Sequence, residues 1–284
     1  MQSLTFSNSF GTVEIGNTSP IFLQKVRGVS GLTSVINRSK SAFQDGSSFK
    51  SSLANDRIIT LEVFFKACDY DELNLMKRNF QQIFNPKVES TIKYNNQTYE
   101  KEILGCYCQE SPTFSQDEKS KYHQTMIVSI ICPEPYWLDL VESMQETSVA
   151  FGGFKFTTTL PMSFKIVGYS SIALNDGDVD TPVRIEFFGP ALNPKVENLT
   201  TGEYVKVNTT LTADQKLVIT TDFENKTVTL VEGAVETDAF NLIDFENSVF
   251  FSLVPGDNLI TYDSDSTKEL AKIEMYWKNR YNGL

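Results

Sequence analysis

Residues Pro190–Leu211, PALNPKVENLTTGEYVKVNTTL, are the stretch that decides the fold. Short runs of β-forming residues alternate here with turn signals such as Thr201-Gly202. The pattern continues through VFFSLVPGDNLITY (Val249–Tyr262) to the closing YWKNRYNGL, and none of it resembles a catalytic constellation. Strands at this spacing, with no helical period between them, predict a β-sandwich or jelly roll.

Turn signals recur through the whole second half of the chain and delimit the strands that we expect there. The turns are marked by Asn175-Asp176-Gly177-Asp178, Thr201-Gly202, Glu224-Asn225 and Pro255-Gly256-Asp257-Asn258. The expected strands are Phe154–Thr158, Met162–Ile166, Pro182–Phe188, Lys195–Asn198, Glu203–Asn208, Lys216–Thr221, Lys226–Val231, Val249–Leu253, Leu259–Tyr262 and Ile273–Trp277.

The first half is typical of strands around one helix. Arg57–Lys66 (RIITLEVFFK) has apolar residues at alternate positions, which predicts a strand with one buried face. Asp69 is a natural N-cap, Glu72 completes a capping box, and Pro86 ends the helical spacing that follows. We therefore predict an amphipathic helix over about residues 69–85, packed on the sheet.

The segments between these elements indicate an arm and a domain boundary. Asn37–Asn55 is rich in Ser, Lys and Gly and is expected to be a loop or an extended arm. Cys132–Leu140 stops the sheet, because its two prolines cannot donate to a ladder. The sequence therefore predicts a mainly β protein of two domains, a β-sandwich with one helix over 1–140 and a second sandwich over 150–284.

Charge is distributed unevenly between the two halves. Residues 1–140 carry 14 basic and 15 acidic side chains, whereas residues 141–284 carry 11 basic and 21 acidic ones. Binding to a phosphate backbone is disfavoured in the acidic half, so no specific nucleic-acid binding is expected. No signal-peptide pattern, no apolar run long enough to span a membrane and no cofactor-binding motif occurs in the chain.

Candidate catalytic and metal-ligating residues are few. The cysteines Cys68, Cys106, Cys108 and Cys132 lack metal-ligand spacing, and buried reduced thiols are favoured over a zinc site. The only histidine, His123, begins an alternating run without a nucleophile elbow. Three alternating aspartates in NDGDVDTP resemble a calcium loop but lack its bidentate Glu, which favours a polar turn. The chain is not expected to be an enzyme, and a wall hydrolase is the weakest alternative.

Sugar binding is the stronger chemical alternative, because sandwich lectins stack sugars on aromatic rings. Trp277, Arg280 and Tyr281 are the candidate residues for contact with a glycan or a partner. Tyr276 points to the opposite face of the strand from Trp277, so at most one of the two lines any given groove.

Several motifs, in order and spacing, resemble the distal tail protein (Dit) family of siphophages across nearly the whole chain. They are DGSS (Asp45–Ser48), the Arg57-Ile58-Ile59 strand opening, the helix after Phe65, the Pro133–Trp137 exit, FKFTTTLPMSF (Phe154–Phe164), Asn175–Glu203, Val254–Asn258 and the closing Tyr276–Gly283. The chain has no room for the large arm that some baseplate-type members insert in the second domain. Direct attachment of receptor-binding proteins is therefore not expected.

The resemblance implies a homo-hexameric ring at the virion tail tip, assembled in the host cytoplasm. The first domains would line a channel for DNA, and galectin-like second domains would decorate the outside. The implied partners are the tail tube protein, the tape measure protein and a tail-associated lysin or fibre. The alternative function is a carbohydrate-binding module that attaches a phage or tailocin particle to cell-wall glycans. Galectin-type galactoside sites use a histidine, which the second domain lacks.

Overall fold

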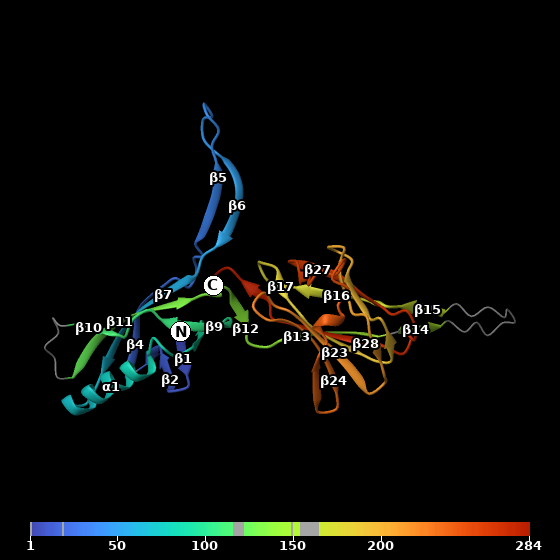
Figure 1. Cartoon of the computed structure of the whole chain (residues 1–284). Helices are drawn as coiled ribbons and strands as arrows, with labels where there is room; N and C mark the ends of the chain where they lie inside the picture. The colour runs from blue at the N-terminus through green and yellow to red at the C-terminus, as the bar shows by residue number, and fades with distance from the viewer. Residues whose placement is uncertain (1, 19, 116–121, 149, 154–164) are drawn as a thin grey trace. The chain divides into compact units, whose positions relative to one another are not determined.

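The computed structural model describes residues 2–18, 20–115, 122–148, 150–153 and 165–284. It contains two compact units, the first formed by Met1–Leu140 with Tyr281–Leu284 and the second by Val141–Arg280 (Figure 1). Regular structure in the described part is almost entirely β with one α-helix, so the predicted mainly β class is confirmed. None of the helices in that part has the length and apolar character of a membrane span.

An antiparallel sheet of eleven strands among the described residues builds the first unit, and its main path runs β2-β1-β8-β9-β11-β7-β4-β3. β7 buries one set of alternate residues, as its sequence predicts, and turns the other set outward. The strands are β1 (Ser3–Asn8), β2 (Gly11–Ile15), β3 (Asn17–Thr18), β4 (Ile21–Arg27), β7 (Arg57–Lys66), β8 (Ser90–Asn95), β9 (Glu100–Cys108), β10 (Thr113–Phe114), β11 (His123–Cys132), β12 (Trp137–Asp139) and β29 (Arg280–Tyr281).

The predicted helix is confirmed as α1 (Tyr70–Ile83). The Asp69 carboxylate accepts a hydrogen bond from the Glu72 backbone N–H at 2.8 Å, which satisfies one of the free donors at the helix start. The Glu72 carboxylate in turn accepts from the N–H of Cys68, one residue before the cap, at 2.6 Å. Beyond the helix, the Phe84 ring stacks on Phe6 of the sheet at 4.4 Å between centroids.

Three segments differ from the expectations. The predicted loop or arm at 37–55 is a β-hairpin, formed by β5 (Ser34–Ser39) and β6 (Ser48–Ala54). The proline-rich exit ends β11, because neither Pro133 nor Pro135 can donate to a ladder, but the chain then returns to the sheet as β12. The predicted strand Phe154–Thr158 and the first three residues of the predicted strand Met162–Ile166 lie outside the described residues, and the last two begin β15 (Lys165–Gly168).

Two sheets form the second unit, in the orders β13-β28-β18-β23-β24-β25 and β16-β27-β20-β21. Apolar side chains from both, such as Ile185 and Ile260, share one core, which makes the unit a β-sandwich. The strands of these two sheets are β13 (Ser143–Ser148), β16 (Ser170–Asn175), β18 (Arg184–Phe188), β20 (Lys195–Asn198), β21 (Glu203–Lys206), β23 (Gln215–Thr221), β24 (Lys226–Glu232), β25 (Val235–Asp238), β27 (Gly256–Asp263) and β28 (Lys272–Trp277).

The second unit also contains three two-stranded pairs and one 3-10 turn. The pairs are β14 (Ala150–Gly153) with β15 (Lys165–Gly168), β17 (Thr181–Pro182) with β26 (Ser252–Leu253), and β19 (Ala191–Leu192) with β22 (Thr210–Leu211); the 3-10 turn is η1 (Phe240–Leu242).

The guanidinium of Arg57 is the centre of the first unit's polar core and is 2% exposed. Its Nε donates to the Pro135 carbonyl and its Nη2 to the Asn282 carbonyl, both at 2.6 Å. Its Nη1 faces three further carbonyls, of which Gly28 is nearest at 2.6 Å. The group also lies 5.9 Å from the Trp137 ring centroid. Burial lowers the pKa of Arg57, because a buried cation loses its hydration.

Glycines permit the close approaches around this guanidinium. Gly28 has φ +86°, and a Cβ there would lie 2.0 Å from the Ile58 carbonyl oxygen. A Cβ on Gly283 would lie 2.1 Å from the carbonyl oxygen of Ser30. These contacts explain why Tyr281–Leu284, which the sequence assigned to the second domain, belong to the first unit.

We expect Arg57→Lys to destabilise the first unit by about 3 kcal/mol, because an ammonium cannot reach all the carbonyls that the planar guanidinium serves. The measurement is urea unfolding followed by Trp137 fluorescence in a Trp277→Phe background. The matched control is Arg27→Lys at an exposed position of β4, which should change the stability by less than about 0.5 kcal/mol. Equal effects of the two substitutions would contradict the role of Arg57.

Candidate functional site

The three residues that the sequence selected for contact belong to both units. Trp277, in β28, is 6% exposed, and its Nε1 donates to the Asn279 side-chain oxygen at 3.1 Å. Arg280 is 7% exposed, and its Nη2 lies 3.8 Å from an Asp222 carboxylate oxygen. Tyr281 belongs to the other unit. The glycan or partner contact of these residues therefore stays a prediction, and their burial gives it no support.

Tyr281 takes part in a packed polar group of the first unit. The ammonium of Lys101 lies 3.7 Å from the Tyr281 ring centroid and forms an ion pair with Asp139. The Tyr281 hydroxyl also donates to Asp139 at 3.4 Å. Burial alone would lower the pKa of Lys101, but its hydrogen bonds with Asp139 and Tyr281 outweigh burial and raise it. This group holds the C-terminal residues against β9 and β12.

The loop that resembles a calcium site is a structural turn. The Asn175 amide donates to the carbonyls of Val179 and Leu253 at 2.9 and 2.8 Å, and its oxygen accepts from the Gly177 N–H. The Asp178 N–H donates to the Arg280 carbonyl at 2.8 Å, so the loop holds the start of β29, three residues after β28 ends. Within the described ranges, no group of His, Cys, Asp and Glu is arranged to hold a metal ion.

Three of the four thiols are buried in the first unit. Cys106 in β9 and Cys132 in β11 have their sulfur atoms 3.1 Å apart, and Cys68 is exposed and away from them. Burial raises the pKa of the Cys108 thiol to about 12, and the neighbouring Cys132 thiol and burial together raise that of Cys106. Raised values keep these groups protonated and poorly nucleophilic, as buried structural thiols are.

The β5–β6 hairpin, which we call the arm, projects from the rest of the first unit (Figure 1). Its exposed apolar side chains include Phe43 at its tip and Phe49 and Leu53 on β6, the last two 67% and 63% exposed. Arg38, Lys40 and Lys50 against Asp45 make it basic in an otherwise acidic chain. Two-stranded hairpins are marginal alone in water. The arm therefore has the character of a segment that another molecule covers.

A second apolar surface lies on the outward face of the first unit's sheet. Tyr107 of β9, Ile131 of β11 and Ile58 of β7 lie side by side in register across three strands. Ile58 is 49% exposed, and Tyr107 is 36% exposed. The sequence signal for this surface was available, because Arg57–Lys66 has apolar residues on both alternating sets. Ile58 and Phe64 of the outward set thus add apolar side chains to a sheet face that also carries Thr60, Glu62 and Lys66.

The outward face of the six-stranded sheet carries a row of carboxylates. Glu146, Glu274 and Glu186 lie directly opposite one another on β13, β28 and β18. Lysines and an arginine of the same sheet pair with two of them, Glu186 and Glu274. Glu186 binds Lys216 at 2.7 Å and also Arg184. Because Glu186 and Glu274 already form ion pairs within the sheet, these two carboxylates do not need a ligand to balance their charge.

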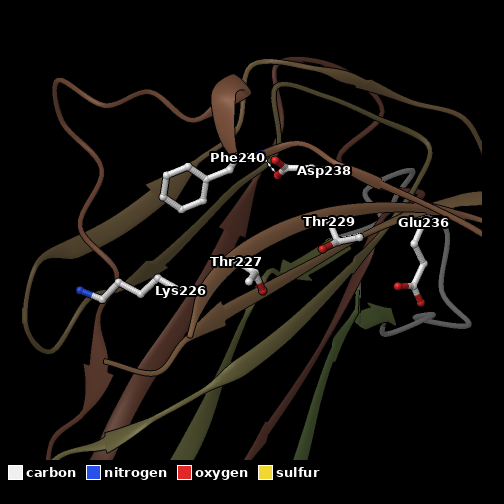
Figure 2. Close-up of a pocket in the computed structure, with 6 residues that line it drawn as sticks. All are labelled: Lys226, Thr227, Thr229, Glu236, Asp238 and Phe240. Carbon is white, nitrogen blue, oxygen red and sulfur yellow. Dashed lines mark hydrogen bonds between the residues drawn. The ribbon is translucent and has the colours of Figure 1, made fainter. Parts of the chain in front are cut away.

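An open groove of about 510 Å³ lies at the far edge of that sheet (Figure 2). In Figure 2 Thr227 and Thr229 lie in the middle of the lining residues, Asp238 lies beside Phe240, Glu236 lies at one side and Lys226 at the opposite side. The sequence did not predict this groove, because β25 has neither the apolar alternation nor the length that marks a strand.

Two family models match the chain. One, described as the siphovirus-type tail component, C-terminal domain (SPP1 Dit), matches residues 176–281, and the phage tail protein RIFT-related domain matches residues 8–132. The chain belongs to the distal tail protein (Dit) family of siphophages. It is a structural component of a phage tail, and so of the virion, and the family and fold are not those of an enzyme.

Solved structures of phage proteins share the fold. The SPP1 Dit (gp 19.1) protein, described as a paradigm of hub adsorption apparatus in phages that infect Gram-positive bacteria, matches with a TM-score of 0.70 and 12% identity over 98% of both chains. Chains of the phage P2 baseplate in its activated conformation with Ca and with Sr match with a TM-score of 0.56 and 12% identity over 100% of both chains. No curated protein sequence matches the chain.

We expect Glu274→Gln to destabilise the second unit by about 1 kcal/mol at pH 7. The hydrogen bond from Lys272, at 2.8 Å, and a second from Tyr276 hold the pKa of Glu274 below its ordinary 4.5. A depressed pKa contributes stability that is present above pH 4.5 and is lost as the pH falls through the folded-state value. The difference in the free energy of unfolding between Glu274→Gln and the unaltered chain should therefore shrink below pH 4.5.

Urea unfolding at several pH values checks this, with Trp277 fluorescence in a Trp137→Phe background. Glu224→Gln, in an exposed turn, removes the same charge without these partners and serves as the control. A pH-independent effect of Glu274→Gln would contradict the expected linkage.

Proposed function

We propose that six copies of this protein form a ring at the phage tail tip. The ring joins the tail tube to the adsorption apparatus and leaves a channel for DNA. Residues 1–140 form the ring, and the sandwich of residues 150–284 lies at its periphery. The observation that carries this proposal is the arm, an exposed apolar hairpin in a protein of a tail-component family.

Ring formation explains the exposed apolar residues of the arm. Solvent-exposed side chains such as Phe43, Phe49 and Leu53 favour burial against another molecule, at roughly 25 cal/mol for each Å² removed from water. An arm that reaches the next copy makes a head-to-tail contact, and such contacts close into a ring when the rotation between copies allows it. The basic charge of the arm suits an acidic neighbour of the same chain.

The row Tyr107–Ile131–Ile58 supplies a second surface for the same contact, because an apolar sheet face is unfavourable in water. Residues 1–140, which would line the channel, carry 14 basic and 15 acidic side chains, a balance without the excess of cations that favours binding to phosphates. Family membership supports the tail tube protein, the tape measure protein and a tail-associated lysin or fibre as partners, with assembly in the host cytoplasm.

The test is the assembly state of the purified chain, by sedimentation over a wide concentration range with negative-stain images of the same samples. We expect six-fold rings in equilibrium with monomers. The double variant Phe49→Ser/Leu53→Ser should shift this equilibrium towards monomers by about tenfold or more, because it removes two large apolar contacts.

The matched control is Phe223→Ser/Leu270→Ser, which removes equally exposed side chains from the second unit. It should leave the equilibrium unchanged. A chain that remains monomeric at every concentration and also with tail tube protein added would overturn the ring. Rings that resist the arm substitutions would overturn the role of the arm.

A further inference from the structure

We propose that the free edge of β25 is a docking site for an extended segment of a partner protein with basic residues at alternate positions. The segment adds to the six-stranded sheet as a further strand, beside the groove of Figure 2. This inference goes beyond ring formation and does not depend on it, because it uses only the second unit.

The backbone of β25 has one paired and one open side. Ala239 donates its N–H to the Val228 carbonyl at 2.8 Å, and Thr229 lies opposite Asp238 in the ladder between β24 and β25. Paired and unpaired positions alternate along an antiparallel strand. The N–H and C=O groups of Glu236 and Asp238 therefore point away from β24, and within the described ranges β25 is the last strand of its sheet.

The side chains beside this edge are complementary to cations. Glu236 and Asp238 are exposed and have no ion pair with another described residue; Asp238 accepts only the Phe240 N–H, at 2.9 Å. Residues two apart on a strand lie about 7 Å apart on the same face. An incoming strand with Lys or Arg at alternate positions places one cation opposite each carboxylate, as cross-strand ion pairs require.

The groove supplies an apolar wall next to these carboxylates. The Phe240 ring lines it and is held by Phe250, stacked at 5.9 Å, and by Phe245 at 5.7 Å. Lys226 lies at the other end, 5.4 Å from the Phe223 ring and 5.7 Å from Phe250. The stems of long basic side chains pack well on such rings while their charged ends reach the carboxylates.

The edge also selects against other occupants. Two β25 edges of neighbouring copies repel each other, because each presents two carboxylates, and charges on an edge strand prevent self-pairing. A saccharide can form hydrogen bonds with the hydroxyl and carboxylate groups of the groove. The outward N–H and C=O groups of Glu236 and Asp238, however, have the spacing that pairs with the backbone of another strand.

The test measures binding of the full chain to a fluorescent peptide, TKVRVKT, by anisotropy at low salt. A peptide of the same composition with the bases three positions apart, KTVRVTK, is its control, because no two of its bases lie two residues apart on one face of a strand. We expect the alternating peptide to bind about tenfold more tightly. Glu236→Gln/Asp238→Asn should weaken it about tenfold, whereas Glu269→Gln/Asp214→Asn, which removes equal charge elsewhere in the second unit, should have little effect.

Glu236→Pro, compared with Glu236→Gln, tests the contribution of the backbone N–H apart from that of the side-chain charge. It removes an outward N–H and keeps the bonds to β24, so it should bind more weakly than Glu236→Gln. If the proline variant does not fold, amide exchange of the unaltered chain replaces it, and bound peptide should slow exchange at Glu236 and Asp238. Equal affinity for both peptides, no protection of these amides, or displacement of the peptide by N-acetylglucosamine oligomers would overturn the proposal, the last by assigning the groove to a saccharide.

Discussion

The stability of the first unit depends on one guanidinium in a cage of carbonyl oxygens. Arg57 has five donors and meets the carbonyls of Gly28, Val29, Gly31, Pro135 and Asn282. No carboxylate takes part in these bonds, so the charge is stabilised by dipoles that the fold itself must bring together. Loss of any one segment leaves the buried guanidinium with an unsatisfied donor, which lowers the free energy of unfolding. The contact therefore joins the start of β7, the turn after β4, the proline-rich exit and the C-terminal residues into one structure.

The two faces of the first unit's sheet serve different purposes. β7 buries Ile59, Leu61, Val63 and Phe65 against the core and α1, and it turns Ile58 outward in line with Ile131 and Tyr107. The arm extends from the residues just before β7 and is apolar and basic. The core is thus built by one set of alternate residues, and the other set, like the arm, leaves apolar side chains exposed.

Local patterns predicted the elements that depend on neighbouring residues. The alternation in Arg57–Lys66 and the cap at Asp69 correspond to β7 and α1, because both are set by residues within a few positions. Contact sites were harder to predict than strands and helices, because alternation assigns Trp277 to one face of its strand but does not say which face is buried. The cage around Arg57 left no pattern at all: its acceptors are backbone carbonyls, one of them 225 residues away. β25 was missed because its pairing comes from β24, not from its own composition.

The path of the chain has a consequence for synthesis. The polypeptide leaves the first unit at Leu140 and re-enters it at Tyr281, so the second unit is an insertion within the first. A ribosome that makes the chain in order completes the sandwich before it adds the carbonyl of Asn282 that Arg57 requires. The inserted unit is therefore able to fold during translation, whereas the unit that contains the arm must wait. The unit that carries the arm is thus the last part of the molecule to be completed, once residue 282 has been translated.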